Sequence, residues 1–314
     1  MKDTVEVRKA YCNTLIDMAK KDDRICVLEA DLMSATGTKP FKDAFPERTF
    51  DVGIAEANMV GIASGLCTFG KIPFVSTFTP FLTRRALDQI EISVAYAKLN
   101  VKLVGTDPGI SAQLNGGTHM SFDDMGIMRG IPTMVVFEPT DATMVAKALP
   151  QIAEHYGPVY IRMYRKITEK VYDDNLEFDL FKSITLKDGK DATIIASGMM
   201  VPVALEAYDK LKEEGIDARV IDMHTWKPLD EEAVYKAATE TGAIVTAENH
   251  SIINGLGSAV SEYLAGVKPT VVKRIGVKDQ FGEVGKEDYL FARYELTADD
   301  IVKAVKEAIA LKKA

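Results

Sequence analysis

The feature that most constrains the fold of this chain is a repeated alternation between short β-rich runs and helical patterns. Five such runs occur in the first half: "ICVLEAD", "IPFVSTF", "VKLVGTD", "TMVVFEP" and "VYIRM". Parallel strands need a crossover connection, and a helix between consecutive strands supplies it. The pattern therefore predicts an α/β fold with a mainly parallel sheet and helices on both of its faces.

A second series of strands and helices follows a charged, irregular stretch at 166–191. Beyond it, "ATIIASG", "ARVIDMHTWKP" and "AIVTAEN" alternate with helical patterns, which predicts a compact βαβαβ unit, and an amphipathic helix ends the chain at 298–313. The length of 314 residues suits two domains. We predict a first domain over 1–170, a linker over 171–191 and a second domain over 192–314.

The net charge and the number of cysteines limit which binding partners and which cellular compartment suit the protein. A net charge of −8 argues against nucleic acid or an anionic membrane surface as partner. The N-terminus has no apolar signal core, and no apolar run is long enough to span a bilayer. Cys12, Cys26 and Cys67 are odd in number and lack metal-ligand spacing. We therefore expect a cytoplasmic protein whose own residues form no metal site.

One acid stands in an unusual setting. Glu56 opens the segment "EANMVGIASGL", in which two apolar stripes at helical spacing leave no wide polar face. A helix of this kind is usually enclosed by protein, where an unpaired charge is costly. Alternatively, Glu56 is an ordinary first-turn acid stabilised by the helix dipole. Both interpretations remain open from this segment alone.

The residues that follow the predicted strands are candidates for ligand contact, because ligands of open α/β sheets bind beyond the carboxyl ends of the strands. Phe78 and Phe81 follow one strand and suit either core packing or stacking against a ligand ring. A glycine-rich polar loop follows "VKLVGTD" and carries Asp107, Asn115 and His119. A loop of this length and composition between buried elements is often functional.

Nine motifs, taken in order, resemble the C-terminal half of transketolase, a thiamine-diphosphate enzyme that moves two-carbon ketol units between sugars. They are "EADL", "DVGIAEANM", "VSTFTPF", "GGTH", "EPTDA", "GPVYIRMYR", "IIASG", "VIDMHTWKPLD" and "ENHSIINGLGSAV". The resemblance covers nearly the whole chain. It implies that the first domain is the thiamine-diphosphate pyrimidine-binding domain and that the second is the transketolase C-terminal domain.

The resemblance also implies roles for particular side chains. Glu56 matches the glutamate that hydrogen-bonds the pyrimidine ring of the cofactor, Phe81 matches the stacking aromatic and Phe78 a second aromatic of that pocket. His119 matches a histidine of the family's loop beside the substrate, which implies a catalytic and substrate-binding role. The family holds the diphosphate and Mg²⁺ with a Gly-Asp-Gly motif, which this chain lacks. We therefore expect a separate N-terminal-type subunit that carries Gly-Asp-Gly, in a heterotetramer with two copies of each chain.

The substrate side departs from the family pattern. Arg8 and Arg165 match two phosphate-contacting arginines, and Ser34 is a looser match. Asp107 stands where many transketolases have histidine, and Asn115 stands where they have aspartate. A free carboxylate at Asp107 would repel a substrate phosphate. We expect sugar phosphates of the pentose phosphate type as substrates, with the choice of sugar altered by these two residues.

Two other classes of protein remain possible. The β subunit of a 2-oxo acid dehydrogenase shares the two-domain plan, the cofactor and the chain length, although "STFTPF" and "GGTH" favour transketolase. A noncatalytic assembly or regulatory module is the other alternative. The joint presence of Glu56, Phe81 and His119 argues against it, because an enclosed acid is costly without a task.

Overall fold

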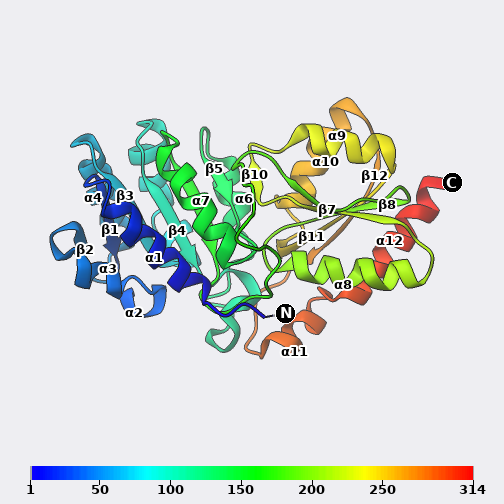
Figure 1. The fold of residues 1–314 in the computed structure, drawn as a ribbon, viewed down its shortest axis with the longest axis horizontal. Coiled ribbons are helices and arrows are strands. Elements are labelled where there is room, and N and C mark those ends of the chain that lie inside the picture. Colours follow the sequence, from blue (N-terminus) through cyan, green and yellow to red (C-terminus); the bar gives the residue numbers. More distant parts are fainter. Residues whose placement is uncertain (1, 314) are drawn as a thin grey trace.

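The computed structural model describes residues 2–313 as two sheets, each covered by helices on both faces (Figure 1). The larger sheet has the order β10-β5-β6-β4-β3-β1-β2, and the smaller has the order β12-β11-β8-β9-β7. All pairings are parallel except those of β10 with β5 and of β7 with β9. The predicted fold class, α/β with mainly parallel sheets, is confirmed.

The strands of both sheets are short and mostly buried. They are β1 (Ile25–Glu29), β2 (Thr49–Asp51), β3 (Ile72–Phe78), β4 (Lys102–Thr106), β5 (Val135–Phe137), β6 (Val159–Met163), β7 (Ile184–Lys187), β8 (Ala192–Ala196), β9 (Ala218–Asp222), β10 (Thr225–Lys227), β11 (Ala243–Ser251) and β12 (Val271–Val277). Strands of parallel sheets are covered on both faces, which explains their near-continuous apolar runs.

The helices differ more in length than the strands do. They are α1 (Val7–Ala19), α2 (Met33–Thr36), α3 (Lys39–Ala44), α4 (Glu56–Thr68), α5 (Thr79–Thr83), α6 (Asp124–Gly130), α7 (Ala142–Glu154), α8 (Met200–Glu213), α9 (Glu231–Glu240), α10 (Leu256–Val267), α11 (Glu287–Arg293) and α12 (Ala298–Lys313), with the tighter or wider turns η1 (Pro46–Arg48), η2 (Gln89–Tyr96) and η3 (Gly109–Asn115). No helix within residues 2–313 combines the length and apolar character needed to cross a bilayer.

Alternate residues of each strand enter different hydrophobic layers. In β1, Ile25 and Val27 pack with α1 and α7, whereas Cys26 and Leu28 pack with α4 and η2. In the smaller sheet, α8 and α12 share a layer, and α9 and α10 share the other. This two-residue period places the helices on opposite faces of each sheet.

Two strands do not follow the predicted division of the chain into two domains and a linker. β7 falls inside the range 171–191 that the sequence predicts as linker, because its alternating exposed residues make this edge strand look irregular. β10 comes from the range predicted as second domain, yet it pairs with β5 at the edge of the larger sheet. The linker prediction is thus wrong for residues 184–187, and the boundary at 170 stays a prediction.

A buried polar network joins the two parts of the chain. Arg162 of β6 is fully buried and donates to Asp124 (2.8 Å), to Glu138 (2.7 Å) and to the main-chain carbonyl of Asn249 (2.8 Å). Glu138 also accepts a hydrogen bond from the Ser197 hydroxyl at 2.6 Å. Because buried charges need partners, this network ties β6 firmly to β11 and to the end of β8.

Candidate active site

Several side chains singled out from the sequence lie at one edge of the larger sheet. Phe78 is the last residue of β3, Asp107 directly follows β4, and Arg165 follows β6 by two residues. These three strands are neighbours and run parallel. Their carboxyl ends therefore meet at the edge where ligands bind in open α/β sheets.

Three rings form an aromatic cluster at this edge. The ring centroids of Phe78 and Phe81 are 5.7 Å apart, and the His119 ring lies 5.9 Å from Phe78 and 5.2 Å from Phe81. The Nδ1 atom of His119 lies 2.9 Å from the Thr118 hydroxyl. All three rings are partly exposed. The cluster is thus a surface that a flat ligand can contact rather than a closed core.

Glu56 is the first residue of α4 and is enclosed, with 4% of its surface exposed. Its Oε1 accepts a hydrogen bond from Nη1 of Arg85 at 3.0 Å. The guanidinium carbon of Arg85 lies 3.8 Å from the Phe81 ring centroid. A buried carboxylate therefore faces a planar cation that is stacked on an aromatic ring.

Arg85 is absent from the residues that the sequence singled out. It follows Phe81 by four positions, about one helical turn, and this spacing was the available signal. The enclosure expected for Glu56 is present. The structure adds a cationic partner to it.

Asp107 and Arg165, which the sequence suggested as opposing charges at the substrate end, form an ion pair. Asp107 is 2% exposed and has a positive φ of 57°. Burial raises the pKa of Asp107, while Arg165 acts in the opposite direction. The Arg165 guanidinium also lies 5.0 Å from the Phe78 ring centroid. Because Arg165 neutralises it, this carboxylate repels a nearby anion less than a free one would.

Arg8 and Ser34 lie together, and the backbone N–H of Arg8 donates to the Arg165 carbonyl at 3.4 Å. The Nη1 atom of Arg8 donates to the main-chain carbonyls of Ala35 (3.0 Å) and Ser34 (3.3 Å), and its Nε donates to Glu6 at 3.1 Å. Arg8 is therefore also neutralised by a carboxylate. Asn115 lies exposed at the end of η3.

The second domain contacts the loop that carries Asp107, Asn115 and His119. The Asn249 side chain accepts from the Ile110 N–H at 3.0 Å and donates to the Pro108 carbonyl at 3.2 Å. Gly109 between them has a φ of 54°, and a Cβ there would lie 2.3 Å from Asn249 Oδ1. Only glycine suits this backbone conformation and this close approach.

Comparison with known proteins assigns both parts of the chain. Residues 3–170 match the family described as Transketolase, pyrimidine binding domain, and residues 182–301 match Transketolase, C-terminal domain. The chain belongs to the transketolase family.

Individual relatives agree with this assignment. The chain is 53% identical, over 96% of its length and 94% of the relative, to the 6-deoxy-6-sulfo-D-fructose transketolase subunit SqwH of Clostridium sp. (strain MSTE9). It is 46% identical, over 96% of its length and 95% of the relative, to a putative transketolase C-terminal section of Methanocaldococcus jannaschii. A solved split gene transketolase, described as an inactive beta4 tetramer, superposes with a TM-score of 0.92 at 45% identity over 98% and 99% of the two chains. These matches favour transketolase over the 2-oxo acid dehydrogenase alternative.

The residues at the edge of the larger sheet fit the pyrimidine half of thiamine diphosphate, the cofactor that membership of the transketolase family implies. Glu56 and Phe81 already hold a flat cationic group, the Arg85 guanidinium, by an ion pair and by stacking. A pyrimidine ring is also flat and also takes a hydrogen bond at a ring nitrogen.

Within residues 2–313, no group of three or more His, Cys, Asp or Glu side chains is placed to hold a metal ion.

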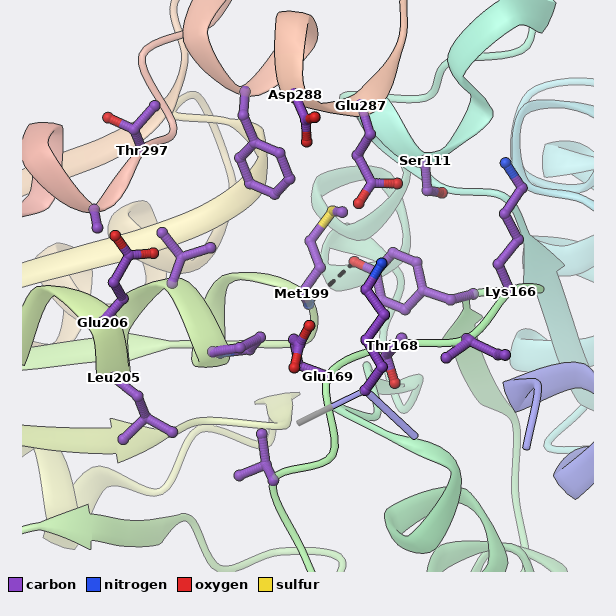
Figure 2. A pocket seen from close by; sticks show the side chains of 18 of the residues that line it. Ser111, Lys166, Thr168, Glu169, Met199, Leu205, Glu206, Glu287, Asp288 and Thr297 are labelled. Atoms are coloured by element: carbon purple, nitrogen blue, oxygen red, sulfur yellow. Dashed lines mark hydrogen bonds between the residues drawn. The ribbon is translucent and has the colours of Figure 1, made fainter. Parts of the chain in front are cut away.

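A cavity of about 800 Å³ opens at this edge of the larger sheet. It begins at Asp107 and Arg165 and runs between the two domains. Figure 2 shows acidic side chains around it from α8 (Glu206) and α11 (Glu287), with Lys166 on the opposite side from Glu206. Asp107 and Arg165 line the cavity, whereas Glu56 and Phe81 do not.

Proposed function

We propose that this chain is the pyrimidine-side subunit of a two-subunit transketolase that acts with thiamine diphosphate and Mg²⁺. It takes part in transferring a two-carbon ketol unit from a ketose to an aldose. The single observation that carries the proposal is the enclosed carboxylate of Glu56, which faces a flat cationic group on the Phe81 ring. When bound, the cofactor would supply an acidic carbon that is a nucleophile once it has lost its proton.

The residues of this chain orient the reacting groups and move protons. We propose that Glu56 shares a proton with the pyrimidine ring nitrogen. A carboxylate in a water-poor site has a strong electrostatic and hydrogen-bonding effect on a bound heterocycle. Phe81 stacks against the ring, and Phe78 closes the pocket beside it. His119, whose Nδ1 lies by the Thr118 hydroxyl, offers its Nε2 to a substrate oxygen.

The diphosphate and Mg²⁺ need residues that this chain lacks, since it has no Gly-Asp-Gly. We assign them to an N-terminal-type subunit, with two copies of each chain in a heterotetramer and the active site at the interface. Two relatives matched over nearly their whole length are named a subunit and a C-terminal section, which supports a split enzyme. The three buried free cysteines suit a reducing cytoplasm.

For the substrate we propose a ketose with a terminal anionic group, held near Arg8 and Arg165. Both arginines already have carboxylate partners, Glu6 and Asp107. The site therefore offers less net positive charge than two free guanidinium groups, which suits a monoanionic sulfonate better than a phosphate of nearly two charges. The relative named for 6-deoxy-6-sulfo-D-fructose supports this choice. Sugar phosphates, and with them the pentose phosphate assignment, are the second candidate, because Arg8 and Arg165 match phosphate-contacting positions.

The test is reconstitution with an N-terminal-type subunit that carries Gly-Asp-Gly. The complex is supplied with thiamine diphosphate, Mg²⁺, an aldose phosphate acceptor and either 6-deoxy-6-sulfofructose or fructose 6-phosphate as donor. We expect ketol transfer only when both subunits are present, with the sulfonate donor preferred, and we expect the Glu56→Gln complex to be nearly inactive. A cofactor-loaded complex that transfers no ketol unit from either donor overturns the proposal.

A further inference from the structure

The Arg85 side chain makes two contacts that a cofactor ring would also need. Its guanidinium donates to the enclosed carboxylate of Glu56 at 3.0 Å, and its carbon lies 3.8 Å from the Phe81 ring centroid. Ion pairing and stacking on a ring are independent interactions. Both are satisfied by the same group in the chain as it stands.

The chemistry of the two groups is alike. A guanidinium and a ring-protonated 4-aminopyrimidine are both flat cations in which an N–C–N unit shares the positive charge. Each presents an N–H to a carboxylate in its own plane and a face to an aromatic ring. A site built for one of them therefore binds the other with the same two residues.

We propose that Arg85 is an internal stand-in for the aminopyrimidine of the cofactor. It compensates Glu56 and covers Phe81 while the pocket holds no cofactor, and it turns toward solvent when the ring enters. The Arg85 side chain is 48% exposed, which leaves it a path out of the pocket, whereas Glu56 is 4% exposed and stays in place. The inference rests on the proposed function, because it takes thiamine diphosphate to be the cofactor.

The stand-in lowers the apparent affinity for the cofactor, because only the fraction of molecules with Arg85 turned outward can bind it. If that fraction is about one tenth, removing the side chain tightens binding by about tenfold. In exchange, Arg85 prevents a buried carboxylate from remaining unpaired in the cofactor-free protein. Its contribution to stability thus exists only before the cofactor binds.

The neighbouring arginine provides a matched control. Arg84 is similarly exposed and donates to Asp123 at 2.9 and 3.0 Å, so Arg84→Ala removes the same charge and a comparable ion pair. The two-subunit complex is titrated with thiamine diphosphate in the presence of Mg²⁺ by calorimetry, as wild type, Arg85→Ala, Arg85→Gln and Arg84→Ala. Thermal unfolding of each complex is measured without cofactor and at saturation.

We expect Arg85→Ala to lower the Kd by about tenfold and Arg85→Gln to lower it by less, since glutamine can still donate to Glu56. Arg84→Ala should leave the Kd within about twofold. Arg85→Ala should also lower the unfolding temperature of the cofactor-free complex but not of the saturated one. The glutamine variant keeps the test available if the alanine variant does not fold.

Two results overturn the stand-in while leaving the proposed function intact. One is cofactor binding by the two Arg85 variants that is equal to or weaker than wild type. The other is an equal loss of unfolding temperature with and without cofactor, which indicates a merely structural role. A wild-type complex that binds no thiamine diphosphate overturns the proposed function itself and this inference with it.

Discussion

The side-chain oxygen of Asn249 accepts a hydrogen bond from the backbone N–H of Ile110 at 3.0 Å. The two residues are 139 positions apart, on β11 of the smaller sheet and on η3 at the edge of the larger one. Positive φ angles at Asp107, Gly109 and Gln113 show that this loop follows an unusual path. Strained backbone of this kind persists only where its surroundings hold it, and Asn249 is one of those restraints.

Replacing Asn249 by alanine should therefore loosen the loop without touching the pyrimidine pocket. The change leaves the buried N–H of Ile110 unpaired, whereas the Pro108 carbonyl still accepts from the Ser111 hydroxyl at 2.6 Å, and we expect a loss of about 1–3 kcal/mol of unfolding free energy. We expect a lower kcat/KM with a nearly unchanged Kd for thiamine diphosphate. Denaturant unfolding and steady-state kinetics of the reconstituted complex measure both effects. Equal losses of kcat/KM and of cofactor affinity would contradict a role confined to the loop.

Glu56→Gln should keep the fold and subunit assembly but reduce turnover by about 100-fold to 1,000-fold, comparable to removing one preorganised electrostatic contact worth ~3 kcal/mol. Glutamine has the same size and can still accept from Arg85, but it cannot carry the carboxylate charge. Single-turnover assays on the assembled variant measure the loss. Near-normal turnover would remove Glu56 from the mechanism.

The chain without its partner should bind thiamine diphosphate weakly or not at all. It retains the pyrimidine contacts of Glu56 and Phe81 but lacks Gly-Asp-Gly, so the charge-assisted contacts to the diphosphate and Mg²⁺ are missing. Calorimetry of the isolated chain, with the two-subunit complex as positive control, measures the difference. Tight, Mg²⁺-dependent binding to the chain alone would contradict the split-enzyme proposal.

Asp107→His should raise activity toward sugar phosphates relative to the preferred donor. The change releases Arg165 from its ion pair and replaces an anion with a neutral or cationic donor. We expect the ratio of kcat/KM values, phosphate donor over sulfonate donor, to rise by about tenfold, or ~1.4 kcal/mol. Asp107→Asn is the matched isosteric variant and should shift the ratio in the same direction by less. Constant ratios in both variants would mean that Asp107 does not select the sugar.

Asp222, buried between the domains, should make stability depend on pH. Burial raises its pKa to about 7, although Thr140 and Tyr172 donate to it at 2.5 and 2.8 Å. The folded chain therefore holds this proton more tightly than the unfolded chain does. The contribution is complete below the ordinary carboxyl pKa near 3.8 and is lost as pH rises through about 7.

Asp222→Asn tests this dependence, since asparagine does not titrate. The unfolding free energy of wild type relative to the variant should fall between pH 4 and pH 8 by on the order of 4 kcal/mol. Denaturant unfolding of both proteins at a series of pH values gives the difference. A difference that stays constant or rises over this range would show that Asp222 is ionised in the folded chain at low pH.

The parts of the site that could be predicted from sequence depend on local signals. The start of an apolar helix marks Glu56 as a candidate, and the position after a strand marks Phe78 and Phe81, whereas their functional roles come from the resemblance to transketolase. These signals need only a few neighbouring residues. The parallel sheets were predictable for the same reason, because short β-rich runs alternate with segments of helical period.

The parts that were missed depend on contacts between distant segments. The neutralisation of Asp107 by Arg165 requires β4 and β6 to be adjacent, which no local pattern states. The bracing of the loop by Asn249 and the return of β10 to the larger sheet require the second domain to be docked. β7 was mistaken for linker because an exposed edge strand is polar on alternate residues.

The position of β10 has a consequence for how the chain is made. β5 has β6 on one side and receives its other neighbour only when residues 225–227 have been synthesised. Until then β5 is an open edge that another nascent chain can pair with. The first domain is therefore completed by a segment that leaves the ribosome after the linker. A chain that stops at residue 170 would leave β5 as an unpaired edge strand, which favours aggregation over independent folding.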